Sequence, residues 1–107
     1  MAVIEWKPKA WQLYNELLEN ARIEYGAKTA RGWENEIVQF YERLKKYPTS
    51  YTPEPLLQGR DSLYRYCHLM HRRFKLIYYF DELKDVVRII DIWDTRMNPQ
   101  ALIRRIK

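Results

Sequence analysis

The feature that most limits the fold of this chain is a run of thirty residues, 64–93, without proline or glycine and rich in tyrosine, isoleucine, valine and phenylalanine. These residue types favour β-strands. Polarity peaks twice within the run, at residues 71–73 and 81–85, and we interpret both peaks as turns. The predicted strands therefore lie near residues 64–70, 74–80 and 86–93. Because the turns are short, the strands should form an antiparallel meander.

The residues before this run predict two helices. Aromatic and apolar residues recur at spacings of three and four over residues 8–25 and again over 29–47, which is the period of an amphipathic helix. Pro8 suits the first turn of one helix and Gly26 its end, while Pro48 must follow the end of the second. The stripes predict two helices that pack their aromatic faces against a common core.

The remaining segments complete one α+β domain over residues 1–107. Residues 2–6 form a short strand candidate, which should join the sheet because an isolated strand leaves its backbone groups unpaired. Prolines and a glycine make residues 48–62 a loop, and an Asn-Pro pair opens a short helix over 99–106. Two consecutive helices in the first half of the chain and three consecutive strands in the second half predict a four-stranded, mainly antiparallel sheet with a helical hairpin on one face.

Alternation along the middle strand separates two faces of the predicted sheet. One face is apolar and should be buried under the helices; it carries Phe74, Leu76, Tyr78 and Phe80. The other face carries Lys75 and should be able to meet a ligand.

The net charge of +5 is unevenly distributed along the chain. Residues 1–59 are neutral overall, so residues 60–107 carry the whole excess. Much of it belongs to one basic cluster, which contains Arg60, Arg65, Arg72, Arg73 and Lys75, with His68 and His71 among them. Such a cluster favours an acidic partner, which can be nucleic acid, an acidic protein segment or an anionic surface. The alternative is an ordinary solvated charged face.

The single cysteine, Cys67, excludes a disulfide framework within the chain and indicates a reducing compartment. The first residues lack the charged and apolar regions of a secretion signal. No apolar run approaches the roughly 20 residues that span a bilayer. We therefore expect a cytoplasmic protein that contacts no membrane and uses no cofactor or metal.

The element order and three short segments resemble the RelE/ParE superfamily of bacterial toxins, also called plasmid stabilisation proteins. These segments are residues 64–65, 74–78 and 89–99, where the last strand leads into an arginine that is followed by an amide and a proline. The resemblance implies the toxin component of a type II toxin–antitoxin module, neutralised by a small antitoxin. RelE-like members cut messenger RNA on the ribosome without a metal, whereas ParE-like members poison DNA gyrase.

The resemblance also implies site residues. Arg96 falls on the family's arginine after the last strand, Lys75 where an arginine is common in the middle strand, and Arg65 near a basic residue of the first meander strand. Metal-free RNA cleavage needs the charge of the scissile phosphate to be stabilised, and guanidinium groups suit that task. If the chain is an endoribonuclease, we predict that these three cations are its catalytic residues and converge on one phosphate.

The other predicted site residues would bind nucleic acid or move protons. The nucleic-acid-binding candidates are Arg72, Arg73 and Arg60, and the candidate general bases are His68, His71 and Tyr78. RelE-like nucleases tend to carry a tyrosine, or a His-Tyr pair, near the C-terminus, and residues 97–107 contain neither residue type. This departure favours a ParE-like or inactive toxin. A non-enzymatic module with the same fold, binding nucleic acid or protein, is the alternative function.

Overall fold

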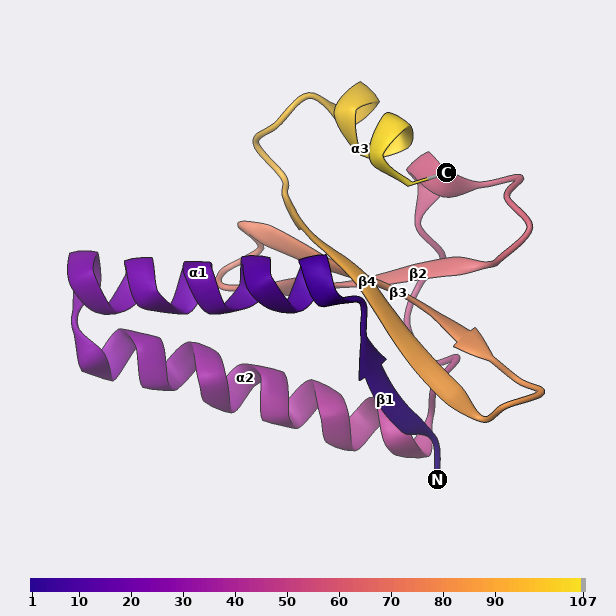
Figure 1. Ribbon diagram of the computed structural model, residues 1–107, viewed down its shortest axis with the longest axis horizontal. Coiled ribbons are helices and arrows are strands. Elements are labelled where there is room, and N and C mark those ends of the chain that lie inside the picture. Colours follow the sequence, from indigo (N-terminus) through magenta and orange to yellow (C-terminus); the bar gives the residue numbers. More distant parts are fainter. Residues whose placement is uncertain (107) are drawn as a thin grey trace.

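The computed structural model describes residues 1–106 and contains a strand, a helical hairpin, three strands and a short helix (Figure 1). In chain order the elements are β1 (Val3–Trp6), α1 (Pro8–Tyr25), α2 (Ala27–Lys46), the 3₁₀ helix η1 (Pro55–Leu57), β2 (Tyr64–Leu69), β3 (Phe74–Asp81), β4 (Val86–Asp94) and α3 (Pro99–Arg105). Apart from η1, which lies inside the predicted loop, the elements begin and end within two residues of their predicted limits. The predicted α+β fold is confirmed. Lys107, the last residue of the predicted domain, lies outside the described residues.

The four strands form one mixed sheet in the order β1-β4-β3-β2. Strands β2, β3 and β4 are antiparallel neighbours, which confirms the predicted meander. Strand β1 joins the sheet beside β4 and runs parallel to it, with Val3 opposite Val86. The sheet therefore unites the two ends of the sequence, and it places the loop before β2 at the opposite edge.

A β-bulge interrupts the pairing of β3 with β4. Ile77 pairs with Asp91 while the next residue, Tyr78, pairs with Ile89, so Ile90 is the additional residue of β4. An extra residue in one strand shifts the alternation of faces by one position beyond it. Because of the bulge, Asp91 projects from the same face as Ile77, away from the helices.

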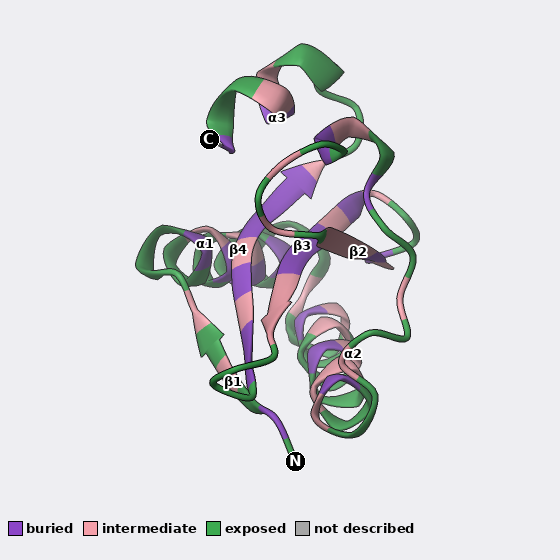
Figure 2. Cartoon of the chain, turned by 90° about the vertical axis from the view of Figure 1, so that its right-hand side faces the viewer, coloured by how far each residue is buried: buried purple, intermediate pink, exposed green. Residues whose placement is uncertain are grey.

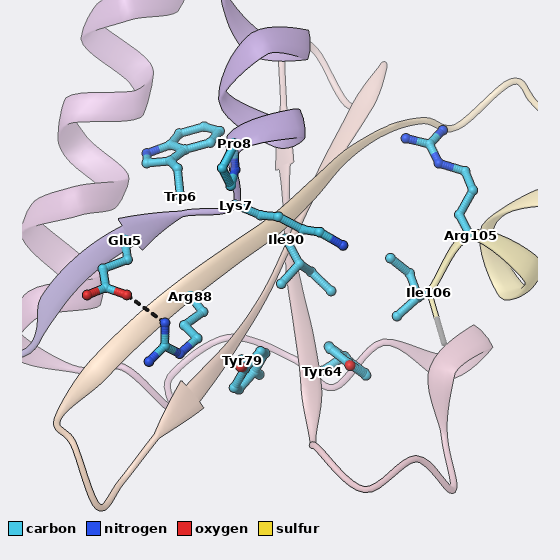
Figure 3. Close-up of a pocket in the computed structure, with 10 residues that line it drawn as sticks. All are labelled: Glu5, Trp6, Lys7, Pro8, Tyr64, Tyr79, Arg88, Ile90, Arg105 and Ile106. Carbon is cyan, nitrogen blue, oxygen red and sulfur yellow. Dashed lines mark hydrogen bonds and ion pairs between the residues drawn. The ribbon is translucent and has the colours of Figure 1, made fainter.

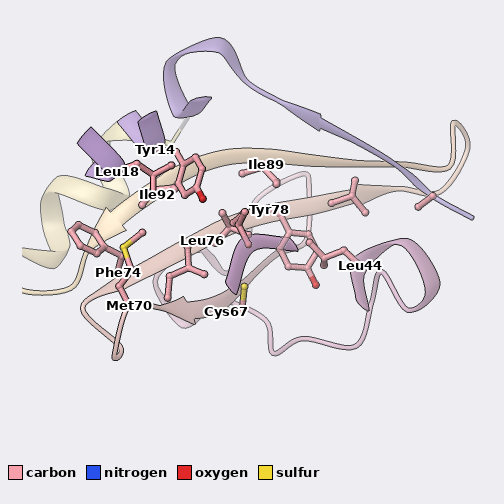
Figure 4. Packing of buried hydrophobic residues seen from close by; sticks show 14 residues of the cluster. Tyr14, Leu18, Leu44, Cys67, Met70, Phe74, Leu76, Tyr78, Ile89 and Ile92 are labelled. Atoms are coloured by element: carbon pink, nitrogen blue, oxygen red, sulfur yellow. The ribbon is translucent and has the colours of Figure 1, made fainter. Parts of the chain in front are cut away.

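The helical hairpin covers one face of the sheet, which we call the inner face (Figure 2). Tyr14 and Leu18 of α1 and Leu44 of α2 pack there against Leu76 and Tyr78 of β3 (Figure 4). The middle strand confirms its predicted buried face, since three of the four apolar residues are buried and the fourth is partly buried: Phe74, Leu76 and Tyr78, then Phe80. Apolar burial of this kind contributes about 25 cal/mol per Å² and dominates the stability of the domain.

The outer face of the sheet is only partly open. A second apolar cluster covers one end of it and unites η1, the sheet and α3 through Leu57, Ile77, Trp93, Leu102 and Ile106. Ile77 is fully buried there, so the prediction that its face of β3 can meet a ligand fails at this residue. The reason is that α3 folds back over the sheet, a contact that no local pattern in the sequence encodes. Within residues 1–106, no helix is both long and apolar enough to cross a bilayer.

Candidate functional site

The open part of the outer face forms a groove of about 650 Å³ (Figure 3). Its walls come from four strands and the end of α3, and include Lys7, Tyr64, Tyr79, Arg88, Ile90 and Arg105. The rings of Tyr64 and Tyr79 meet edge to face with centroids 5.7 Å apart. The Lys7 side chain extends over Ile90 toward the α3 side of the groove (Figure 3). The groove therefore combines flat rings with cationic groups, a pattern that suits an anionic ligand with a planar part.

Internal carboxylates already engage two of these cations. An Arg88 Nη1–H donates to the Glu5 carboxylate at 2.6 Å, and an Arg105 Nη2–H donates to the Asp91 carboxylate at 2.6 Å. Asp91 is buried, and this burial raises its pKa while the charge of Arg105 partly opposes the rise. Lys7 makes no side-chain hydrogen bond or ion pair within the described chain, so it is the cation of the groove that is available to a ligand.

Lys75, the predicted middle-strand cation, is held by an internal carboxylate. Its Nζ donates to both oxygens of Glu54, at 3.0 and 3.3 Å, and lies 4.3 Å from the centroid of the Tyr66 ring. The Glu54 side chain is fully buried, and it also accepts the backbone N–H of Leu56, which begins η1. The ion pair therefore fixes the proline-rich loop to the outer face, and the Glu54 carboxylate compensates the charge of Lys75.

Arg65 lies on the opposite face of the sheet from Lys75. It pairs with Tyr78 of the inner face, whereas Lys75 pairs with His68 and projects outward. The Arg65 guanidinium donates to the carbonyl oxygen of Tyr51 at 2.6 Å. The predicted convergence of Arg96, Lys75 and Arg65 on one phosphate is therefore wrong. Side chains alternate between the two faces of a sheet, and Arg65 projects from the inner face whereas Lys75 projects from the outer face. Whether each residue acts in catalysis stays a prediction.

Arg96 lies in the exposed turn after β4 and forms a bidentate ion pair with the side chain of Asp94. Its Nε–H and Nη2–H donate to the two carboxylate oxygens at 3.2 and 3.0 Å. These hydrogen bonds are the main reason that the pKa of Asp94 lies below its usual range, and they raise the pKa of Arg96. Exposed Arg96 can still exchange this partner for a ligand anion.

The three predicted nucleic-acid-binding arginines occupy two separate places. Arg72 and Arg73 lie at the turn between β2 and β3, where Thr95 donates its hydroxyl to their carbonyl oxygens at 3.1 and 2.9 Å. Arg60 instead serves as a clamp for α3, because it donates to the carbonyl oxygens of Ile103, at 2.9 Å, and Ile106. The structure thus brings Arg72 and Arg73 close to the Arg96 turn and gives Arg60 a structural role.

The candidate general bases differ sharply in accessibility. Tyr78 is fully buried and donates its hydroxyl to the carbonyl oxygen of Pro48, and burial raises its pKa. His68 is half-buried on the outer face, where desolvation first and the charge of Lys75 second lower its pKa. His71 is exposed in the β2–β3 turn. Of the three, a buried tyrosine of raised pKa is the least able to take a proton from a substrate.

Comparison with known proteins identifies the family. The model of the ParE toxin of type II toxin–antitoxin systems matches residues 4–99, which is most of the chain. The chain belongs to this family of toxins. Comparison with curated proteins finds no match. The family match makes this protein a toxin of a type II toxin–antitoxin system and confirms the resemblance to the RelE/ParE superfamily.

Solved structures share the fold of this toxin at low sequence identity. The chromosomal ParDE system from P. aeruginosa is 16% identical, with a TM-score of 0.66, over 88% of this chain and 96% of that chain. The isolated E. coli RelE toxin is 14% identical, with a TM-score of 0.59 over the full length of both chains. A metal-bound toxin from Helicobacter pylori is 18% identical, with a TM-score of 0.61, over 90% and 97% of the two chains. These likenesses establish the RelE-like fold.

Sequence reasoning missed the two buried carboxylates of the toxin. Glu54 stands between two prolines in a loop, where no periodicity marks it for burial. Asp91 interrupts the apolar run of β4, and an acid in such a run signals a buried, paired charge. Within residues 1–106, no three His, Cys, Asp or Glu side chains gather in a geometry that could hold a metal ion.

Proposed function

We propose that this toxin arrests growth by inhibiting DNA gyrase in the cytoplasm, as ParE-like toxins do, and that a small antitoxin neutralises it. The observation that carries the proposal is the ion pair between Glu54 and Lys75. At the position where RelE-like nucleases commonly place an arginine, the cation of this chain is saturated by a carboxylate of the same chain. An internal anion occupies the place that a phosphate would need.

Three further features support a target other than messenger RNA. Arg65 projects from the inner face, so it cannot join Lys75 at one phosphate. Tyr78 is buried among apolar side chains. Residues 97–107 contain neither tyrosine nor histidine. Metal-free cleavage requires a base, an acid and a stabilised phosphorane together, and of the predicted site residues only His68 pairs directly with Lys75 in the sheet.

The antitoxin partner is supported by relatives. One structural neighbour is the ParDE toxin–antitoxin system, and another is the E. coli RelBE toxin–antitoxin complex, with a TM-score of 0.57. We propose that an acidic or amphipathic antitoxin segment folds onto this toxin along the sheet and the groove beside the helices. The excess of +5 carried by residues 60–107 would speed the encounter with such a segment.

Induced expression in cells tests the target. We expect growth arrest, loss of negative supercoiling in a reporter plasmid, and intact messenger RNA at early times after induction. Co-expression of the adjacent small reading frame should restore growth, and the two proteins should copurify at moderate salt. Matched cultures that express Arg96→Ala report whether the exposed turn contributes to toxicity.

The opposite pattern would reassign the target. Ribosome-dependent cleavage of messenger RNA with unchanged plasmid topology would place this toxin with the RelE-like nucleases. If Arg96→Ala then abolished cleavage, the catalytic role predicted for Arg96 would be supported. Arrest without either effect would contradict both targets, and a wild-type protein without arrest would favour the non-toxic binding module.

A further inference from the structure

A pocket of about 410 Å³ lies where the tip of the helical hairpin meets the β2–β3 turn. We call it the aromatic pocket, and its walls are Tyr25, Thr29, Trp33, Met70, His71 and Arg73. The rings of Tyr25 and Trp33 contact each other with centroids 6.4 Å apart. Tyr25 remains about half exposed although its ring is large and mostly apolar. Tryptophan, tyrosine, methionine and arginine are the residues most enriched at protein interfaces.

The sheet side of the aromatic pocket has a fixed, strained shape. Met70, His71 and Arg72 have φ angles of 55°, 57° and 65°, so three successive non-glycine residues are left-handed. Such conformations persist only where surrounding contacts enforce them. Two contacts do so here. The Glu36 carboxylate accepts the N–H of Met70 at 3.0 Å, and the Thr95 hydroxyl donates to the carbonyl oxygen of Arg72 at 3.1 Å. The pocket is thus preformed.

The charge beside the aromatic pocket is positive and comes from the sheet. The turn supplies the exposed side chains of His71 and Arg72 and the half-buried side chain of Arg73. The Arg73 Nε is buried and has no hydrogen-bond partner within residues 1–106. The neighbouring helix turns contribute the bases Lys28 and Arg31 and the acids Glu24, Glu34 and Glu36, and the Glu36 carboxylate already accepts the Met70 N–H. A fitting occupant would present a large apolar side chain flanked by carboxylates.

The opposite end of the same molecule carries that chemistry. The β3–β4 turn, residues 81–85, holds three acids and one lysine around Leu83, whose side chain is 100% exposed. The turn has a defined shape, because the Lys84 N–H donates to the Asp81 carboxylate at 3.2 Å. In Figure 1 this turn lies at the right of the molecule and the hairpin tip at the left. The turn therefore presents one fully exposed apolar side chain flanked by carboxylates.

We propose that this toxin associates with itself head to tail, with the Leu83 turn of one copy in the aromatic pocket of the next. The two surfaces cannot meet within one copy. They lie at opposite ends of β3, which has eight residues and is therefore roughly 26 Å long. Leu83 supplies the apolar anchor, while Glu82 and Asp85 approach Arg72 and Arg73. The pairing is charge-complementary, and it goes beyond any action on gyrase.

The two-ended geometry determines what kind of assembly results. The interface joins unlike surfaces, so each added copy again presents one free turn and one free pocket. One anchor and one charge cluster make a small interface, of the class below about 1,200 Å² that gives weak and transient complexes. Association should therefore rise with concentration and should weaken in 1 M salt, where the Debye length falls to about 3 Å.

Sedimentation velocity of the purified full-length toxin tests the proposal. We expect concentration-dependent growth of the sedimentation coefficient in 50 mM salt and its suppression in 1 M salt. Leu83→Ser should weaken association by about 10- to 100-fold, the effect of exposing one buried leucine. Arg73→Glu should weaken it from the pocket side. Lys84→Ser is the matched control, since it alters the same turn without removing the anchor or an acid, and it should associate at least as well as wild type.

Mixing the two weakened variants separates this geometry from others. Leu83→Ser keeps a working pocket and Arg73→Glu keeps a working turn, so an equimolar mixture should form dimers that grow no further. A symmetric interface would instead stop the wild-type toxin at the dimer, and that limit would overturn the head-to-tail arrangement. A wild-type toxin that stays monomeric up to millimolar concentration would overturn the proposal, as would variants that associate as well as wild type. Circular dichroism of each variant excludes misfolding as the cause.

Discussion

Replacing Lys75 by methionine should strongly destabilise the toxin. The substitution keeps the length of the side chain but removes the charge that compensates the Glu54 carboxylate. The Glu54 side chain is 0% exposed and the Lys75 side chain 18% exposed, so water cannot replace the lost partner. Breaking a buried ion pair from one side costs about 3–5 kcal/mol.

That magnitude is large for a domain of this size. A chain of 107 residues has a total stability of roughly 5–15 kcal/mol. Lys75→Met should therefore remove about a fifth or more of it and lower the Tm by roughly 12 °C or more. Glu54→Gln combined with Lys75→Met should recover most of the loss, because no buried charge is then unpaired and glutamine can still accept the N–H of Leu56.

Urea unfolding, followed by tryptophan fluorescence, measures the free energy of unfolding of Lys75→Met, of the double variant and of a control variant. Lys28→Met is the control, since Lys28 is exposed on α2 and its loss should change stability by less than about 0.5 kcal/mol. If Lys75→Met lost less than about 1 kcal/mol, the pair would be hydrated and exchangeable. Lys75 would then be free to meet a phosphate, and the main argument against a nuclease would fail.

Three further substitutions test other parts of the fold. Arg72→Gly should stabilise the toxin by up to about 1 kcal/mol in urea unfolding, because glycine relieves the left-handed strain at this φ of 65°; a loss would show that side-chain contacts outweigh the strain. Arg60→Ala should speed amide hydrogen exchange throughout α3, since two helix-end carbonyl groups lose their donor; unchanged exchange would refute the clamp. Burial raises the pKa of Asp91, so the folded state binds this proton more tightly than the unfolded chain, and stability from this group is lost as pH rises above about 4. Asp91→Asn should flatten that part of the pH–stability curve, and an unchanged slope would contradict the assignment.

Much of the fold could be predicted because its signals are local. Prolines and glycines mark the ends of α1 and α2, and the period of apolar residues distinguishes these helices from the strands. The meander follows from short turns between β-rich segments. The parallel pairing of β1 with β4 is not local, but an unpaired strand is unfavourable, and that argument alone was enough to place β1 in the sheet.

The candidate site could not be predicted to the same degree. Charge and the family resemblance indicate its residues, but neither reveals which face of a strand a residue occupies or which acid it meets. Arg65 and Lys75 are both basic strand residues, yet the register sends them to opposite faces. Arg60 belonged to the predicted nucleic-acid surface but caps α3, because a helix end needs donors for its last carbonyl groups.

The parallel pairing of β1 with β4 has a consequence for biosynthesis. Val3 pairs with Val86, so β1 cannot pair within the sheet until β4 has been synthesised. Contacts so distant in sequence slow folding, since a long loop must close before they form. During translation the helical hairpin and β1 emerge early and lack their sheet until β4 has left the ribosome. A nascent toxin of this topology cannot present its finished sheet surfaces before β4 has left the ribosome.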